Sequence, residues 1–331
     1  IIGVILFLRL GYIVGVGGII GSIAIILLAV SVTLSTGLAL SSITTNIKIG
    51  SGGAYSIISK TLGLEIGGSV GIPLYLAQAL SVALYIFGFA ETFVFIFPGY
   101  ELVDIALVAF FAVFGLTFIS TKLAVRAQTI VFVVVCLALV SVVTGNLSFG
   151  SQAFSTPMYG AFELTSFWGL FALFFPAVTG LMAGVGMSGE LSDPKKQIPK
   201  GVISGLGVTA VIYVLLVLWF GYFATPDQLV SNNLIIVELA AFKPLVLLGI
   251  LAATFSSALT TLLAAPRVLQ ALSNNSILPF SDFLAKRSQD GEPRNALLAT
   301  GCIIGVAILM GSLNSVAQFL TMFFLITYMM I

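Results

Sequence analysis

The run Phe174-Phe175-Pro176-Ala177-Val178-Thr179-Gly180-Leu181-Met182-Ala183-Gly184 lies at the centre of an uncharged stretch from Thr165 to Gly189. The stretch can cross a bilayer, because a membrane helix needs about 20 apolar residues. However, Pro176 removes a backbone donor and clashes with the preceding turn, and the glycines that follow weaken a helix. We therefore expect the helix to stop and restart near Thr179 and Gly180. Bare backbone at mid-membrane is costly unless it is buried in protein or lines a wet cavity, so the break predicts a binding site. A proline kink that only shapes packing is the alternative, since proline and glycine are common in membrane helices.

The composition is that of an integral membrane protein. Of the 331 residues, 59% are hydrophobic and 8% are charged, whereas soluble domains are about 25% charged. Histidine is absent, which excludes histidine metal sites, Ser-His-Asp catalysis and histidine proton relays. The two cysteines, Cys136 and Cys302, lie in apolar runs and indicate neither a disulfide framework nor a metal cluster. We expect no enzymatic activity, no resident cofactor and no nucleic-acid partner.

Hydropathy predicts about ten membrane spans in one transmembrane domain over residues 1–331. The first span ends near residue 15, and the others cover 18–45, 66–97, 102–119, 124–145, 166–189, 201–224, 244–271, 295–312 and 314 onward. The first and last spans are expected to be truncated, because the chain begins and ends in apolar sequence.

The positive charges predict the orientation of these spans. The connections after the even-numbered spans hold most of the basic residues, whereas the opposite side has Lys243; the first group is Lys48, Lys60, Lys122, Arg126, Lys195, Lys196, Lys200, Lys286, Arg287 and Arg294. The positive-inside rule therefore places the N-terminus in the cytoplasm. We expect a multi-pass protein of the cell membrane.

Two similar steps suggest an internal repeat. Gly3-Val4-Ile5 and Gly180-Leu181-Met182 are Gly-apolar-apolar triplets five spans apart. An odd number of spans per half inverts the second half, so residues 1–145 and 166–331 would form two inverted repeats. Such triplets are common in apolar chains, and chance is the alternative.

An unwound segment offers backbone groups to ions of either sign. Amides freed at a half-helix start favour an anion, and Gly180, Leu181 and Met182 carry no polar side chains that would compete. The same argument applies to Gly3-Val4-Ile5. An anion site made of amides is therefore expected at both steps.

Neutral oxygens near the break favour a large, weakly hydrated cation. Thr179 supplies a hydroxyl, Pro176 leaves carbonyls accessible, and Tyr85 lies mid-span among apolar residues. The alternative for Tyr85 is a structural hydroxyl bonded to neighbouring backbone.

Span eight carries small hydroxyl residues on one helical face. Ala253, Ser256, Ser257 and Thr260 follow the three-and-four spacing and would form part of a cage for a small cation. Small hydroxyl residues also allow membrane helices to pack closely, which is the alternative.

Charged residues within the spans are few. Arg9 lies in the outer part of the first span and Glu91 near the outer end of the third, so we expect an ion pair at the external vestibule. The alternative is that each reaches headgroups or water. No other carboxylate lies at mid-depth, which argues against an acidic proton relay.

Several blocks resemble the cation-chloride cotransporters of the amino acid-polyamine-organocation superfamily, over essentially the whole chain. These blocks are Gly3-Val4-Ile5-Leu6-Phe7-Leu8-Arg9-Leu10, residues 52–59 (GGAYSIIS), residues 84–92 (LYIFGFAET), residues 175–199 and residues 256–272. The resemblance implies an all-α, LeuT-like transporter core of 5+5 inverted repeats with spans one and six discontinuous. Members usually have twelve spans, of which this chain would hold the first ten.

The resemblance also implies roles for individual residues. Potassium would bind at Ile1, Tyr85, Pro176 and Thr179. Chloride would bind at Gly3, Val4 and Ile5, and again at Gly180, Leu181 and Met182 with the hydroxyl of Tyr328. Sodium would bind at Ala253, Ser256 and Ser257, and Arg9 and Glu91 would form the outer gate.

The implied function is a secondary active symporter that moves chloride with potassium, sodium or both by alternating access. Ser256-Ser257 matches the sodium-dependent branch, whereas Ile2 stands where sodium-dependent relatives tend to have an aromatic residue. An amino-acid or polyamine permease of the same superfamily is the alternative, although such permeases usually carry a Gly-Ser-Gly-like step where this chain has Gly3-Val4-Ile5. Inorganic ions and the lipid bilayer are the expected partners, and a homodimer is left open.

Overall fold

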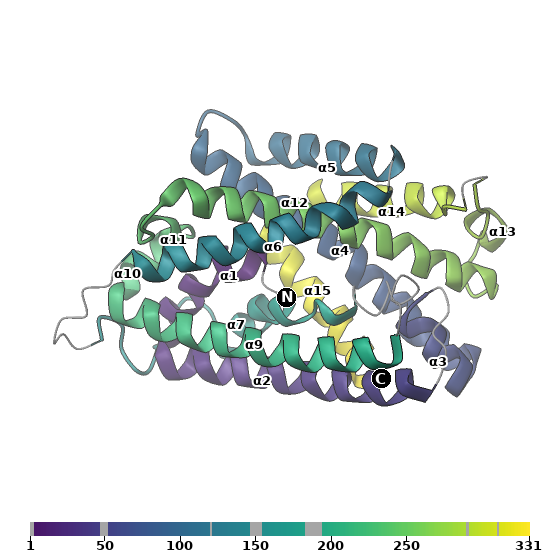
Figure 1. Cartoon of the computed structure of the whole chain (residues 1–331), viewed down its shortest axis with the longest axis horizontal. Helices are drawn as coiled ribbons and strands as arrows, with labels where there is room; N and C mark the ends of the chain where they lie inside the picture. Colours follow the sequence, from purple (N-terminus) through teal and green to yellow (C-terminus); the bar gives the residue numbers. More distant parts are fainter. Residues whose placement is uncertain are drawn as a thin grey trace.

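The computed structural model describes residues 3–46, 52–119, 121–145, 154–182, 194–288, 291–309 and 311–331. Over these ranges the regular structure is helical, and no strand is present. The helices form one elongated bundle (Figure 1). They are α1 (Val4–Leu8), α2 (Leu10–Asn46), α3 (Ala54–Leu62), α4 (Leu64–Ile96), α5 (Leu102–Ile119), α6 (Thr121–Thr144), α7 (Phe167–Phe174), the 3₁₀ helix η1 (Phe175–Val178), α9 (Pro194–Phe223), α10 (Pro226–Ser231), α11 (Ile235–Glu238), α12 (Lys243–Asn274), α13 (Ser281–Leu284), α14 (Arg294–Leu309) and α15 (Leu313–Met330).

Five of the described helices are long and apolar enough to cross a membrane, namely α2, α4, α9, α12 and α15. Four shorter apolar segments accompany them: 102–118, 128–144, 167–178 and 294–309. The multi-pass membrane character predicted from composition is confirmed. Hydropathy did not predict α3, α10, α11 and α13, which lie where connections were expected.

α2 combines the first two predicted spans, which meet at Gly18. Gly18 has φ 67° and ψ 179°, outside the helical region and accessible mainly to glycine. The backbone groups freed there are satisfied by a crossing segment, because Ile19 and Ile20 donate to the carbonyls of Pro157 and Met158 at 3.2 and 2.9 Å. The loop from 154 to 166 therefore anchors the corner between the two spans.

α4 and α12 pack against each other in the middle of the bundle, and α4 also contacts α15, α5 and α14. α2 and α9 run side by side along one edge (Figure 1). Helices that are far apart in the sequence thus surround the broken segment.

The helix in the deciding stretch stops as expected. Ser166 caps α7, its hydroxyl accepting from the amide of Gly169 at 3.2 Å. The α-helix ends at Phe174, and a 3₁₀ turn over Phe175–Val178 places Pro176 near its start, where the missing N–H costs nothing. Thr179 and Gly180 then form a turn. Leu181 and Met182 are helical again, so the helix stops and restarts around Thr179 and Gly180 as expected. Residues 183–193 lie outside the described residues.

Candidate functional site

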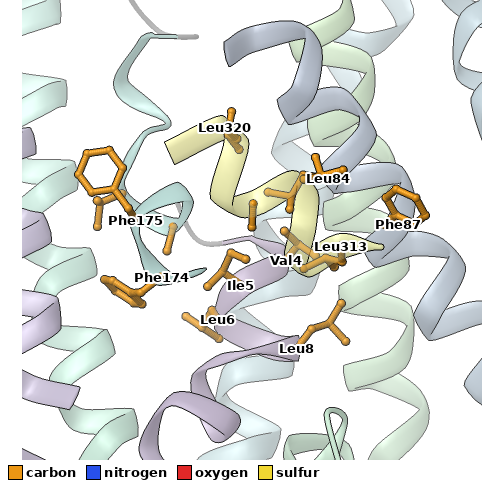
Figure 2. Close-up of a cluster of buried hydrophobic side chains, with 14 of the residues drawn as sticks. Val4, Ile5, Leu6, Leu8, Leu84, Phe87, Phe174, Phe175, Leu313 and Leu320 are labelled. Carbon is orange, nitrogen blue, oxygen red and sulfur yellow. The ribbon is translucent and has the colours of Figure 1, made fainter. Parts of the chain in front are cut away.

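The short helix α1 and the broken turn of residues 175–180 meet in an apolar cluster at the centre of the bundle. α1 contributes its buried side chains to the same cluster as the end of α7, the start of η1, α4 and α15. Figure 2 shows this cluster with Val4, Ile5, Leu6, Leu8, Leu84, Phe87, Phe174, Phe175, Leu313 and Leu320 labelled. Because its members are almost fully buried, the cluster fixes α1 and η1 relative to α4 and α15.

The start of α1 lies close to α4. A methyl group added to Gly3 would be 4.0 Å from Cε1 of Tyr85, and one added to Gly88 would be 2.0 Å from Cγ2 of Val4. Gly3 caps α1 without a side-chain hydrogen bond. The first amides of α1, at Val4 and Ile5, therefore remain helix-terminal donors beside Tyr85.

Hydroxyl groups bond the backbone of the broken turn. The Thr179 hydroxyl donates to the Pro176 carbonyl at 2.9 Å, and the buried Tyr328 hydroxyl donates to the Thr179 carbonyl at 3.1 Å. Tyr213 lies 3.5 Å from the Ala177 carbonyl, a weak contact. The Pro176 and Thr179 carbonyls also accept from the backbone amides of Thr179 and Met182, both at 3.4 Å, so each of these two carbonyls has two donors. Tyr213 was missed from the sequence, although a tyrosine in an apolar span was the available signal.

A cavity of about 520 Å³ opens beside the turn. It brings together five of the predicted residues, Tyr85, Gly180, Ala253, Ser256 and Ser257. The remainder of its lining comes from α6, α9 and α12: Gln128, Val131, Phe132, Val135, Ser204, Gly205, Val208, Thr209, Thr260 and Thr261. Among the described residues, this lining contains hydroxyl, amide and backbone groups but no carboxylate or basic side chain.

A hydrogen-bonded chain connects α6 to the serine pair of α12. Gln128 donates through Nε2 to the Thr260 hydroxyl at 2.6 Å, and that hydroxyl donates to the Ser256 carbonyl at 2.9 Å. Gln128 was not predicted from the sequence. A glutamine near the beginning of an apolar span was the signal.

The remaining predicted residues surround the cavity without lining it. Pro176, Thr179, Leu181, Met182 and Tyr328 are buried around the broken turn. Gly3, Val4 and Ile5 lie on the α1 side. Ile1 lies outside the described residues.

Arg9 and Glu91 form a bidentate ion pair, with Nη1 to Oε2 at 2.9 Å and Nη2 to Oε1 at 2.7 Å. Arg9 is 4% exposed and Glu91 is 18% exposed. Arg9 also donates to the Leu8 carbonyl at 3.0 Å and, through Nε, to Oδ1 of Asn314 at 2.7 Å. The pair joins the first span to α4 and α15. Asn314 was missed from the sequence, where it is one of two side-chain amides, with Gln318, in the apolar last span.

The site offers neutral oxygens, turn amides and helix-terminal amides next to the cavity of about 520 Å³. Neutral oxygens can replace the water shell of a weakly hydrated cation, and amides at helix starts can hold an anion. No group of three or more His, Cys, Asp or Glu that could hold a metal ion occurs among the described residues.

Comparison with known proteins gives a family match over the whole chain. Residues 1–331 match the family model described as "Amino acid permease". Similar curated proteins include Solute carrier family 12 member 2 from Mus musculus, 32% identical over 389 aligned residues that cover 99% of this chain and 32% of the relative. Solute carrier family 12 member 1 from Homo sapiens is 32% identical, with coverage of 99% and 36%. Member 3 from Pseudopleuronectes americanus is 30% identical, with coverage of 99% and 38%. The chain spans about a third of the length of these relatives.

Proposed function

The chain belongs to the amino acid permease family, and on this premise we propose that it moves chloride together with potassium, sodium or both by alternating access. The family is one of transporters and not of enzymes, and its fold is the all-helical, LeuT-like one. The observation that carries the proposal is the cavity of about 520 Å³, which has a helix break beside neutral oxygens from several helices and no carboxylate among its described lining residues. Similarity to three members of solute carrier family 12 supports the same choice.

The proposed potassium ion binds beside the broken turn. Tyr85 and Thr179 would supply hydroxyl oxygens, and Pro176 and Ile1 would supply carbonyls. A methyl group added to Gly3 would lie 4.0 Å from Cε1 of Tyr85, so the start of α1 is close to Tyr85. This closeness supports a cation site shared between spans one, three and six.

The proposed chloride ions bind to amides at the two breaks. One would lie at Gly3, Val4 and Ile5, and the other at Gly180, Leu181 and Met182 with the hydroxyl of Tyr328. The Tyr328 hydroxyl donates to the Thr179 carbonyl. It would turn from that carbonyl to chloride, a choice open to a hydroxyl that has one proton.

Sodium coupling is proposed at Ala253, Ser256 and Ser257, and the chain would then belong with the sodium-dependent members. Both serines line the cavity with Ala253. The two hydrogen bonds that lead from Gln128 through the Thr260 hydroxyl to the Ser256 carbonyl support the site, because they connect the serine pair of α12 to α6.

The membrane arrangement is proposed from sequence. The N-terminus would be cytoplasmic, the protein would lie in the cell membrane, and residues 1–145 and 166–331 would be inverted repeats. The ion pair of Arg9 and Glu91 would then close the outer side as a gate. A homodimer is an arrangement open to this protein.

Amino-acid transport is the second candidate function, because the family model carries that description and the cavity is large enough for an organic molecule. The part of the lining that the structure describes offers no carboxylate to pair with an amine, which favours inorganic ions. Uptake of labelled amino acids that chloride does not affect would reverse this preference.

The test is chloride-dependent uptake of ⁸⁶Rb⁺, a potassium substitute, into liposomes that contain the purified protein. Tyr85→Phe and Thr179→Ala should each lower uptake at least tenfold, because each removes a cation ligand. Thr33→Ala is a matched control, since Thr33 is buried in α2 and bonds only to the Ala29 carbonyl at 3.0 Å. Retained uptake in both site variants would overturn the proposed cation site.

Sodium coupling has a separate test. The double variant Ser256→Ala/Ser257→Ala should remove stimulation by sodium and leave stimulation by potassium. Sodium stimulation that survives in the double variant would remove the serine pair from the sodium site, and absence of sodium stimulation in the unchanged protein would place this chain with sodium-independent members.

A further inference from the structure

A second, much smaller cavity lies where the start of α3 meets α4 and α12. Its volume is about 10 Å³, enough for one water molecule or one monatomic ion. The lining consists of Gly52, Gly53, Ala54, Leu74, Gln78, Met182, Ala264, Arg267 and Val268. It shares no lining residue with the larger cavity.

Gln78, which lines this small cavity, has a buried polar atom without a partner. The residue is 4% exposed, and its Oε1 has no hydrogen-bond partner among the residues that the structure describes. Buried side-chain amides in folded proteins almost always find partners, so an unpaired one that lines a cavity indicates a missing occupant.

The surroundings of Gln78 are positive. α3 has nine residues, and Gly53 caps it without a side-chain hydrogen bond, which leaves the amides of its first turn as donors beside the cavity. Gly52 and Gly53 have φ values of 104° and 55°, so the chain turns sharply into the helix. Arg267 adds a guanidinium group to the lining, and this group also has partners outside the cavity. Its Nη2 lies 3.9 Å from Oε1 of Glu292, a group outside the lining.

We propose that this cavity is a binding site for a single monovalent anion, chloride in the working protein, formed by Gln78, Arg267 and the amide end of α3. The terminal amide of Gln78 can rotate by half a turn without changing its shape, which brings its NH₂ group toward the ion in place of Oε1. A cation is disfavoured by Arg267 and by the helix end.

Met182 connects this site to the break. It lines the small cavity, and it belongs to the Gly180–Met182 step proposed to hold chloride. Chloride that leaves the Gly180–Met182 step toward α3 would therefore bind next at Gln78. This role rests on the proposed function, whereas the anion site itself does not.

Crystals grown or soaked in bromide provide the direct test, because bromide is located by its anomalous scattering. A peak between Gln78 and the amides of Ala54 and Tyr55 is expected. Absence of a peak there overturns the proposal, including the case of an ordered water molecule in its place. A peak at Gln78 without one at Gly180–Met182 would support this site and contradict the proposed chloride site at the break, so the two failures are distinguishable.

A charge variant tests the role in transport. Gln78→Glu places a fixed negative charge where the anion would bind and should slow ³⁶Cl⁻ exchange across liposome membranes at least tenfold. Gln78→Met, which keeps the length without the charge, should slow exchange less than Gln78→Glu does. Equal exchange rates in the wild-type protein and a folded Gln78→Glu variant would contradict a role on the chloride path, and the bromide experiment decides the site if that variant does not fold.

Discussion

Replacing Glu91 with glutamine removes the negative charge that faces Arg9 while the shape of the side chain is kept. Arg9 would then be a guanidinium that is 4% exposed and has lost both charged contacts, at 2.7 and 2.9 Å. Its bonds to Asn314 and to the Leu8 carbonyl would remain. The variant therefore isolates the cost of leaving a buried charge without its counter-charge.

Breaking a buried ion pair by removing one partner costs about 3–5 kcal/mol. Glu91 is 18% exposed and keeps some contact with water, so we expect the lower end, about 3 kcal/mol. For a chain of this size the midpoint of thermal unfolding falls by about 2 °C per kcal/mol, which predicts a decrease of about 6 °C.

The assay heats the purified protein in detergent and measures the monodisperse fraction that remains by size-exclusion chromatography. The double variant Arg9→Met/Glu91→Leu should be more stable than the single variant Glu91→Gln, because two apolar side chains leave no buried charge. Glu101→Gln is the control, since Glu101 is exposed and its change should stay within about 0.5 kcal/mol. A midpoint shift below 1 °C for Glu91→Gln, or additive effects of the Arg9 and Glu91 changes, would refute the reasoning.

Three further outcomes are expected. Gly18→Ala should destabilise the protein by at least about 2 kcal/mol, because its φ is 67° and the added methyl would lie 2.4 Å from facing backbone, whereas Gly207→Ala, with open space, should be neutral or slightly stabilising; equal thermal midpoints would contradict this. Tyr328→Phe removes the hydroxyl that donates to the Thr179 carbonyl and should raise the half-saturating chloride concentration severalfold in uptake assays, so an unchanged value would remove Tyr328 from the site. Cys302 is exposed on the apolar helix α14 and should react with membrane-permeant N-ethylmaleimide but slowly with a charged thiol reagent; equal labelling rates would show that this face meets water.

The helices were largely predictable from hydropathy. α5 was predicted over 102–119 and has those bounds, and the stop near Thr179 follows from proline and glycine chemistry that acts locally. The short helices α3, α10, α11 and α13 were not predictable in this way, because their stability depends on tertiary contacts and not on a long apolar run.

The site was predictable where chemistry alone singles out a residue. A charge within a span has few favourable environments, which is why Arg9 and Glu91 were singled out, and hydroxyls in apolar helices drew attention to Tyr85 and Ser256. Gln78 was missed because an amide in an apolar helix has many equivalent interpretations. Only the packing of α3 against α4 and α12 shows that its Oε1 lies without a partner.

The central claim is that the cavity beside the broken span couples chloride to an alkali cation. The most direct measurement is ³⁶Cl⁻ uptake into proteoliposomes while external potassium and sodium are each replaced by N-methyl-D-glucamine, with the membrane potential clamped at zero. We predict ³⁶Cl⁻ uptake that requires external potassium or sodium and that disappears when both cations are replaced. Uptake that continues without either cation would contradict the account.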